Sequence, residues 1–321
     1  MDFSTIIEKI NDAQNIAIIS HTSMDGDAIG SSLGLMLALK KRGKNVTTYV
    51  EEEIPERFDF WDNREDILYY DEDKDYSFHD LLIVVDVGDK KLLGKRVKLL
   101  EQIPNNLAID HHAIHLAYSK ISYVDKDAAA AGELIYKLVN EMGITLDLDI
   151  ATCLYVAIST DTGRFKFNNT TKTTHMIAGD LITYGIKTSE ISNKIFDEST
   201  KQRTKLIAKT IDTLEMFEND KIALMSITRD MMQSVGAKDS EQEGIIDYVI
   251  NICGVEVGVL IKQKQDGTLR ASLRSKSYVD VSKIANEFGG GGHKMAAGCS
   301  SNQDISHFKQ QLVEYIRREI K

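Results

Sequence analysis

The sequence has few cysteines. Its three thiols, Cys153, Cys253 and Cys299, lie far apart without the paired spacing of a metal site, and each has apolar or small neighbours. We therefore expect buried free thiols rather than disulfides or cysteine ligands. Long apolar runs are lacking too, since no stretch reaches the length of a membrane span and no basic segment followed by an apolar one opens the sequence. These absences predict a soluble, cytoplasmic protein.

An excess of positive charge is also missing. The sequence has 39 Lys and Arg against 49 Asp and Glu, for a formal net charge of −10. Because affinity for nucleic-acid phosphates rests on clustered Lys and Arg, this balance argues against a protein that coats long DNA or RNA. A small anionic substrate stays open, since metal ions or a local basic patch can reverse the sign of the potential.

The apolar runs that are present indicate an α/β protein with two domains, for which 321 residues suffice. We expect a mainly parallel sheet with helices on both faces over residues 1–190, a helical linker over 191–220 and a smaller α/β domain over 221–321. Continuous apolar stretches such as 81–85 are typical of strands buried on both faces.

The periodicity of apolar residues predicts the individual elements. Strands are expected at residues 15–20, 45–50, 81–85, 107–109, 222–227, 255–262 and 268–275. Helices are expected at residues 3–10, 28–41, 90–101, 128–142, 149–159, 173–184, 243–252, 281–288 and 305–320. Residues 57–80 are charged and aromatic, and their pattern does not order them.

The most informative segment is the loop over residues 21–28, between the first long strand and its helix. It contains His21, Asp25 and Asp27. Two aspartates two residues apart repel one another unless a cation lies between them. A divalent metal satisfies this, and the mixture of carboxylate with imidazole suits Mn²⁺ best, with Fe, Zn and Mg as competitors. Alternatively, Asp25 and Asp27 only stabilise the positive end of the next helix and His21 is a solvated strand end.

Further acidic and imidazole groups follow the other predicted strands and one helix. These candidates are Asp86, Asp110, His111, His112 and Asp161. In an open parallel α/β sheet, ligands bind at the carboxyl edge of the strands, where these residues would meet. Each alone could be a cap or a hydrogen-bonded core residue. Together they predict a site for two metals that share a bridging carboxylate.

A second cluster of polar residues lies near the C-terminus. Arg270, Ser272 and Arg274 alternate with apolar residues and so share one face of a predicted strand. Residues 262–294 contain seven Lys or Arg against three Asp or Glu, in an otherwise acidic protein. A run of glycines follows, whose bare N–H groups would let a phosphate or base approach. The candidate substrate-binding residues are Arg270, Ser272, Arg274, Gly290, Gly291, Gly292 and His293. The alternative is a solvated strand face.

These motifs resemble those of the DHH phosphoesterases. The loop over 21–28, Asp86, the Asp110-His111-His112 triplet and Asp161 match the four motifs of that family in order and spacing. Residues 270–297 resemble its DHH-associated C-terminal domain, with the Gly-Gly-Gly-His signature. The length and layout are most similar to the bacterial members that degrade very short RNA. Met24 stands where many relatives have proline, but it replaces no ligand.

The resemblance implies a role for each candidate residue. One metal would be held by His21, Asp25 and Asp86, and the other by Asp27, Asp86, His111 and Asp161, with Asp86 as the bridge. Asp110 would orient an imidazole by accepting its N–H. His112 would face the substrate phosphate. We add Arg164, in the loop that contains Asp161, as a second candidate for neutralising phosphoryl charge, with a surface ion pair as the alternative role of Arg164.

The implied activity is metal-dependent phosphoester hydrolysis. Expected substrates are oligoribonucleotides a few nucleotides long, cut to 5′ mononucleotides, and adenosine 3′,5′-bisphosphate (pAp), cut to AMP, with two Mn²⁺ ions as cofactors. A homodimer is compatible with this layout. One alternative is a phosphodiesterase for pApA or cyclic di-AMP, and another is a nucleotide-binding module without catalysis. An inorganic pyrophosphatase is disfavoured because the second domain lacks a Ser-Arg-Lys-Lys-Gln type motif.

Overall fold

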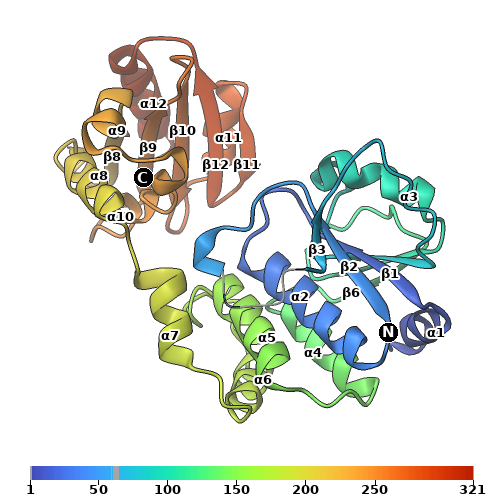
Figure 1. The fold of residues 1–321 in the computed structure, drawn as a ribbon. Helices are drawn as coiled ribbons and strands as arrows, with labels where there is room; N and C mark the ends of the chain where they lie inside the picture. The colour runs from blue at the N-terminus through green and yellow to red at the C-terminus, as the bar shows by residue number, and fades with distance from the viewer. Residues whose placement is uncertain (1, 59, 61–64, 321) are drawn as a thin grey trace. The chain divides into compact units, whose positions relative to one another are not determined.

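The computed structural model describes residues 2–58, 60 and 65–320 (Figure 1). The chain divides into two compact units, Met1–Glu198 and Ser199–Lys321. Each contains a six-stranded sheet flanked by helices, which confirms the α/β class with two domains. The predicted linker over 191–220 spans the end of one unit and the start of the other. Within the described residues, every helix is too short or too polar to cross a membrane.

The first unit is built on an entirely parallel sheet. Its strands are β1 (Asn15–Ile19), β2 (Asn45–Val50), β3 (Ile67–Tyr69), β4 (Leu81–Val85), β5 (Asn106–Asp110) and β6 (Ile121–Val124). Their order is β3-β2-β1-β4-β5-β6, so the chain winds outward in both directions from the adjacent pair β1 and β4. The carboxyl ends of two such strands form the crevice in which open α/β sheets bind ligands.

Helices cover both faces of this sheet because its side chains alternate between two apolar cores. Ile16, Ile18 and Ile83 point to α1 (Ser4–Asp12), α2 (Gly26–Lys41), α4 (Ala131–Glu141) and α5 (Leu148–Asp161). Ala17 and Val84 point to the opposite core, which contains η2 (Lys90–Lys98) and α3 (Leu99–Gln102). The remaining helices of the unit are η1 (Glu56–Phe58), α6 (Lys172–Ile182), α7 (Thr188–Ser192) and the π-helix η3 (Asn193–Asp197).

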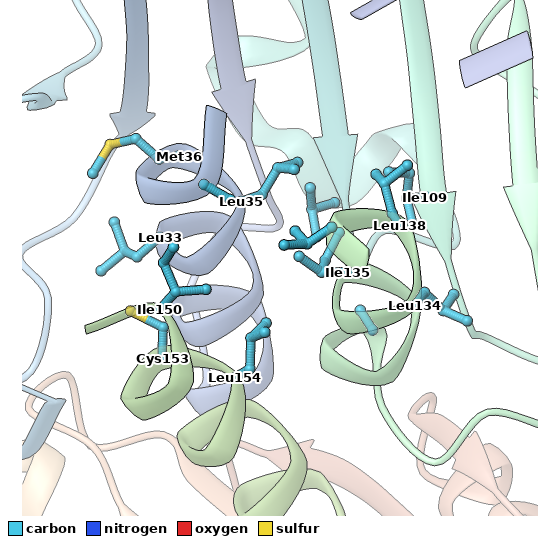
Figure 2. Packing of buried hydrophobic residues seen from close by; sticks show 14 of the residues in the cluster. Leu33, Leu35, Met36, Ile109, Leu134, Ile135, Leu138, Ile150, Cys153 and Leu154 are labelled. Carbon is cyan, nitrogen blue, oxygen red and sulfur yellow. The ribbon is translucent and has the colours of Figure 1, made fainter. Parts of the chain in front are cut away.

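Helices α2 and α5 pack unusually closely, as Figure 2 shows around Leu33 and Cys153. Gly26, Gly30 and Gly34 are four residues apart and form one face of α2. A Cβ atom on Gly30 would lie 2.4 Å from the carbonyl oxygen of Cys153, and one on Gly26 would lie 2.4 Å from Cγ2 of Thr160. This approach brings the C-terminal end of α5 beside the loop that precedes α2.

The close packing gives a stability prediction. Gly30→Ala should lower the free energy of unfolding by about 1 to 3 kcal/mol, because the added methyl group collides with backbone atoms of α5 that cannot yield independently. Gly179→Ala is the matched control, since Gly179 is exposed within α6 and has open space around it. That change should be neutral or slightly stabilising. Urea denaturation of both variants measures the difference, and equal midpoints would contradict the packing argument.

The second unit has a mixed sheet. Its strands are β7 (Glu215–Phe217), β8 (Ile222–Ile227), β9 (Val257–Gln263), β10 (Leu269–Ser275), β11 (Gly291–His293) and β12 (Ala296–Ser301), in the order β11-β12-β10-β9-β8-β7. Only β8 and β9 are paired in parallel among these described strands. The helices are α8 (Lys201–Ile211), α9 (Arg229–Val235), η4 (Asp239–Gln242), α10 (Ile246–Ile250), α11 (Val281–Glu287) and α12 (Ile305–Glu319).

Some elements differ from the expectations. The segment over 90–101 forms 3₁₀ turns and a short α-helix rather than one helix, because Gly94 has φ 58° and ψ −136°. The helix expected over 243–252 shrinks to α10. Strands β6 and β12 were not expected, since β6 is only half-buried and β12 consists of small residues. The unordered region over 57–80 contains η1 and β3, and its residues 59 and 61–64 lie outside the described residues.

Candidate metal centre

Acidic and imidazole side chains from four elements converge at the carboxyl ends of β1, β4 and β5. Three groups have potential ligand atoms within 4.8 Å of one another. They are His21 with Asp25 and Asp86, then Asp27 with His111 and Asp161, and finally Asp86 with His111 and His112. The structure thus brings together all six residues proposed as metal ligands, which the chain separates by up to 140 positions.

The loop after β1 presents His21 in a fixed orientation. Nδ1 of His21 donates a hydrogen bond to the carbonyl oxygen of Thr22 at 2.7 Å, which leaves Nε2 free to face the carboxylates. Nε2 lies 3.7 Å from both Asp25 Oδ1 and Asp86 Oδ2. Asp25 also caps α2, because its side chain accepts a hydrogen bond from the Ala28 N–H at 3.0 Å. The capping role considered as an alternative is therefore present alongside the cluster.

Asp27 is almost completely buried and joins two helices. Its Oδ1 accepts hydrogen bonds from Ser31 Oγ at 2.7 Å and from the Gly132 N–H at 3.0 Å. Oδ2 accepts one from the Ala131 N–H, at the start of α4, and lies 3.5 Å from His111 Nε2. Burial, and next the charge of Asp86, raises the pKa of Asp27 well above its usual value.

Asp86 lies at the centre of the site. Its φ of 61° is in the left-handed region, which aspartate and asparagine adopt more readily than most other non-glycine residues. Oδ2 faces His21, whereas Oδ1 lies 3.4 Å from His111 Nε2 and accepts no hydrogen bond from the described residues. Burial works to raise the pKa of Asp86, but the His111 and His21 imidazoles outweigh it and lower the pKa.

The two oxygens of Asp86 therefore face different groups, so this carboxylate would be able to contribute to both of two metal positions. Oδ1 of Asp86 is buried without a hydrogen-bond donor, and it lies beside imidazoles and other carboxylates. A site of this kind is better suited to a divalent cation than to a structural hydrogen-bond network.

Two buried contacts orient the histidines that follow β5. His111 Nδ1 donates to the carbonyl oxygen of Ala128 at 3.2 Å, and its Nε2 lies 3.6 Å from Asp161 Oδ2. Asp110 is fully buried, and its Oδ1 accepts from His112 Nδ1 at 2.7 Å. The hydrogen bond to Asp110 is the main reason why the pKa of His112 is raised.

His115 is a site residue that the sequence did not reveal. Its Nδ1 donates to Asp110 Oδ2 at 2.6 Å, so Asp110 holds His112 and His115 together. The only available signal was a third imidazole close to the His111-His112 pair in sequence, and its spacing of five residues from Asp110 matches no regular element.

The carboxylates dominate the electrostatics of the cluster. Burial lowers the pKa of His21, but Asp25 and Asp86 raise it more strongly, to about 10. His111 behaves in the same way, and Asp86 and Asp27 raise its pKa to about 10. Burial is the main reason why the pKa of Asp161 rises to about 6. Four carboxylates and two imidazoles thus form a centre that takes up positive charge.

This electrostatic balance predicts that metal binding releases protons. At pH 7 the imidazoles of His21 and His111 are protonated in the metal-free protein, because their pKa of about 10 lies above that pH. A cation must displace these protons, so its affinity should rise as the pH rises. Calorimetric titration with Mn²⁺ in two buffers of different ionisation enthalpy should give different heats. Equal heats would contradict the assignment of both imidazoles as ligands.

Arg164 lies outside the three groups. Its Nη1 is 2.7 Å from Asp197 Oδ1, and its guanidinium carbon lies 4.6 Å from the centre of the Phe196 ring, both in η3. Gly163, Arg164 and Phe165 all have positive φ, so the chain turns sharply directly after Asp161. Contact between Arg164 and a phosphoryl group therefore stays a prediction that requires the ion pair to open.

The substrate-binding candidates of the second unit lie on and beside β10. Burial alternates along this strand, so Arg270, Ser272 and Arg274 share its less buried face. Ser272 is paired in register with Gly298 of β12, and Arg270 with Lys262 of β9. A groove of about 620 Å³ includes Lys262, Arg270 and Ser272 among its lining residues. Lys262 was not expected from the sequence, and its pKa is lowered first by burial and then by Arg270.

The glycine run forms the edge hairpin of β11 and β12. A Cβ atom on Gly290 would lie 2.2 Å from the carbonyl oxygen of Gly298. Gly292 has φ 146°, and its Cβ would lie 2.5 Å from the carbonyl oxygen of Ala296. These two glycines are thus required by the close strand pairing, whereas Gly291 and His293 are exposed on the hairpin.

Asp86 belongs to two of the three groups of acidic and imidazole residues, and these groups lie at the carboxyl edge of a parallel sheet. Such an arrangement suits the two divalent ions that many phosphatases and nucleases use. The fold and the site together define a metal-dependent phosphoesterase.

The chain belongs to the DHH family of phosphoesterases. Residues 15–158 match the DHH family, N-terminal domain, and residues 205–321 match the DHHA1 domain. It is 30% identical to a probable bifunctional oligoribonuclease and PAP phosphatase NrnA of Streptococcus mutans, over 97% of this chain and 99% of that protein. It is 29% identical to the bifunctional oligoribonuclease and PAP phosphatase NrnA of Thermus thermophilus, over 95% and 90%.

A solved structure supports the same relationship. The crystal structure of an exopolyphosphatase-related protein from Bacteroides fragilis is 26% identical to this chain and superposes with a TM-score of 0.89. The match covers 98% of this chain and 96% of that one.

Proposed function

We propose that this protein hydrolyses oligoribonucleotides of a few nucleotides to 5′ mononucleotides and also dephosphorylates pAp, with two divalent metal ions, preferably Mn²⁺. The observation that carries the proposal is the position of Asp86, whose two oxygens face separate ligand groups. Relatives that match nearly the whole chain are named as oligoribonucleases and PAP phosphatases, which supports the choice of substrates.

The residues of the first unit have distinct tasks in this proposal. The metal ions would polarise the phosphoryl oxygens and lower the pKa of the attacking water. His21 and His111 present Nε2 as a ligand because a backbone carbonyl oxygen fixes each Nδ1–H. The hydrogen bond to Asp110 raises the pKa of His112 and so favours the protonated imidazole, whose Nε2–H on the partly exposed ring would donate to a phosphoryl oxygen.

The second unit would bind the remaining phosphates of the substrate. Arg270 is exposed on β10, and Arg274 donates a hydrogen bond to the carbonyl oxygen of its neighbour Leu273. Ser272 lies between the two arginines and is paired in register with Gly298, which has no side chain. Cations on a partly exposed sheet face are suited to phosphate contacts.

A substrate panel tests the proposal. The Mn²⁺-loaded protein should cleave a labelled diribonucleotide and pAp faster than a long single-stranded RNA, since a site built for terminal phosphates does not follow a long strand. Equal turnover of the short and long RNA would refute the length preference. The panel includes pApA and cyclic di-AMP, and a clear preference for either would assign the protein to those substrates instead. Absence of hydrolysis across the panel would refute an enzymatic role.

A further inference from the structure

We propose that the ion pair between Glu51 and the buried Arg96 positions the His21 imidazole for metal binding through the segment η2. Both residues would be positioning residues, since neither touches the metal ligands. This inference rests on the metal site in the proposed function. The roles proposed above for the catalytic residues do not explain why this charged pair is present, and the inference gives it a role.

The first observation is the anchoring of η2 to the end of β2. The side chain of Arg96 is 1% exposed, and its Nε and backbone N–H lie 3.3 and 3.1 Å from Glu51 Oε1. Nη1 donates to the carbonyl oxygen of Tyr49 at 3.0 Å. A guanidinium is removed from water only at considerable cost, so this geometry fixes where η2 lies against the sheet.

The second observation is a chain of hydrogen bonds from η2 to the metal ligand. The carbonyl oxygen of Leu92, in η2, accepts a hydrogen bond from the Thr22 N–H at 2.7 Å. The carbonyl oxygen of Thr22 in turn accepts from His21 Nδ1 at 2.7 Å. The N–H group of Thr22 is therefore bound to η2, and the carbonyl oxygen of Thr22 orients the His21 imidazole.

The third observation is steric and independent of these hydrogen bonds. Gly94 lies in η2 between Leu92 and Arg96, in a conformation open almost only to glycine. A Cβ atom there would lie 2.6 Å from Glu51 Oε1 and 2.6 Å from Thr22 Cγ2. Glu51, Gly94 and Thr22 are thus packed without spare room, and a shift of one must move the others.

The pair should affect one metal position selectively. His111 is oriented by Ala128, and Asp27 by the start of α4, so neither depends on η2. Loss of a residue that orients a metal ligand typically weakens metal binding by about 10- to 100-fold. We expect this loss at the group of His21, Asp25 and Asp86, with the group of Asp27, His111 and Asp161 retained.

Two variants test the role. Glu51→Gln keeps the shape of the side chain but removes its charge. If this variant folds poorly, the double variant Glu51→Gln with Arg96→Met is used instead, because it leaves no buried charge unpaired. The matched control is Glu256→Gln in the second unit, where a buried carboxylate accepts hydrogen bonds from the Val279 and Tyr278 N–H groups. All three changes should lower the melting temperature, so stability alone does not distinguish them.

Mn²⁺ titration followed by calorimetry and electron paramagnetic resonance supplies the distinguishing measurement. The Glu51 variants should bind one ion with the affinity of the parent and the other about 10- to 100-fold more weakly, with an isolated-ion signal in place of a coupled pair. The Glu256 variant should bind like the parent. Parent-like binding of both ions by the Glu51 variants, or equal weakening of both, would overturn the positioning role alone. A parent protein that binds no pair of ions would overturn the proposed function as well.

Discussion

Asp86→Asn should reduce turnover of a diribonucleotide by on the order of a thousandfold or more, because stabilisation by the two metal ions is worth several kcal/mol. Asparagine has nearly the same volume and tolerates the left-handed backbone at this position, where φ is 61°. The fold should therefore survive. The amide cannot supply the two anionic oxygens that face His21 and His111, so both metal positions should be weakened.

The control for Asp86→Asn is Asp220→Asn, since Asp220 has a similar φ of 65° but is exposed in the second unit. Its activity and metal content should match the parent. Turnover and bound Mn²⁺ are measured for both variants, with circular dichroism to verify folding. If Asp86→Asn keeps a tenth or more of the parental turnover, the bridging role of Asp86 is wrong.

The double variant Arg270→Ala with Arg274→Ala should lower kcat/KM for short oligoribonucleotides by on the order of a hundredfold, since each charged hydrogen bond to a phosphate contributes about 1.5 to 3 kcal/mol. The loss should appear mainly in KM, because these arginines bind the substrate away from the bond that breaks. The dependence of affinity on salt concentration should also become weaker.

Lys283→Ala provides the control for the arginine variant, because Lys283 is exposed on α11 of the same unit and has no proposed contact with substrate. Its kinetics should be those of the parent. Binding of a labelled diribonucleotide in the presence of a metal chelator separates recognition from hydrolysis. Unchanged binding by the double arginine variant would remove the second unit from substrate recognition.

The strands whose ends form the site could be predicted from the sequence, whereas some other strands could not, and the difference lies in how deeply each strand is buried. β4 and β5 are buried on both faces, so their apolar residues form uninterrupted runs, and Asp86 and Asp110 mark where those runs end. β6 has only half-buried residues and β12 is made of small ones, so neither carries the periodicity that identifies a strand.

The residues around the ligands were less accessible to prediction. His115 and Ala128 reach the site through loops, and a loop contact leaves no periodic signal. The close packing of α2 against α5 depends on glycines of α2, which in the sequence are merely residues of low helix propensity. In the structure they allow the close approach that brings Asp161 to the site. The pairing of Arg164 with Asp197 likewise spans 33 positions without any local pattern.

The contacts of Asp27 affect how divergent relatives of this protein should be compared. Because its carboxylate also holds the first N–H groups of α4 and the hydroxyl of Ser31, a descendant that had lost all hydrolytic activity would still need an aspartate there to fold. The presence of this aspartate in a relative is therefore weak evidence that the relative is an active enzyme. His21 and Asp161 make fewer contacts that stabilise the fold, so replacement of either residue is a better indicator of an inactive homologue.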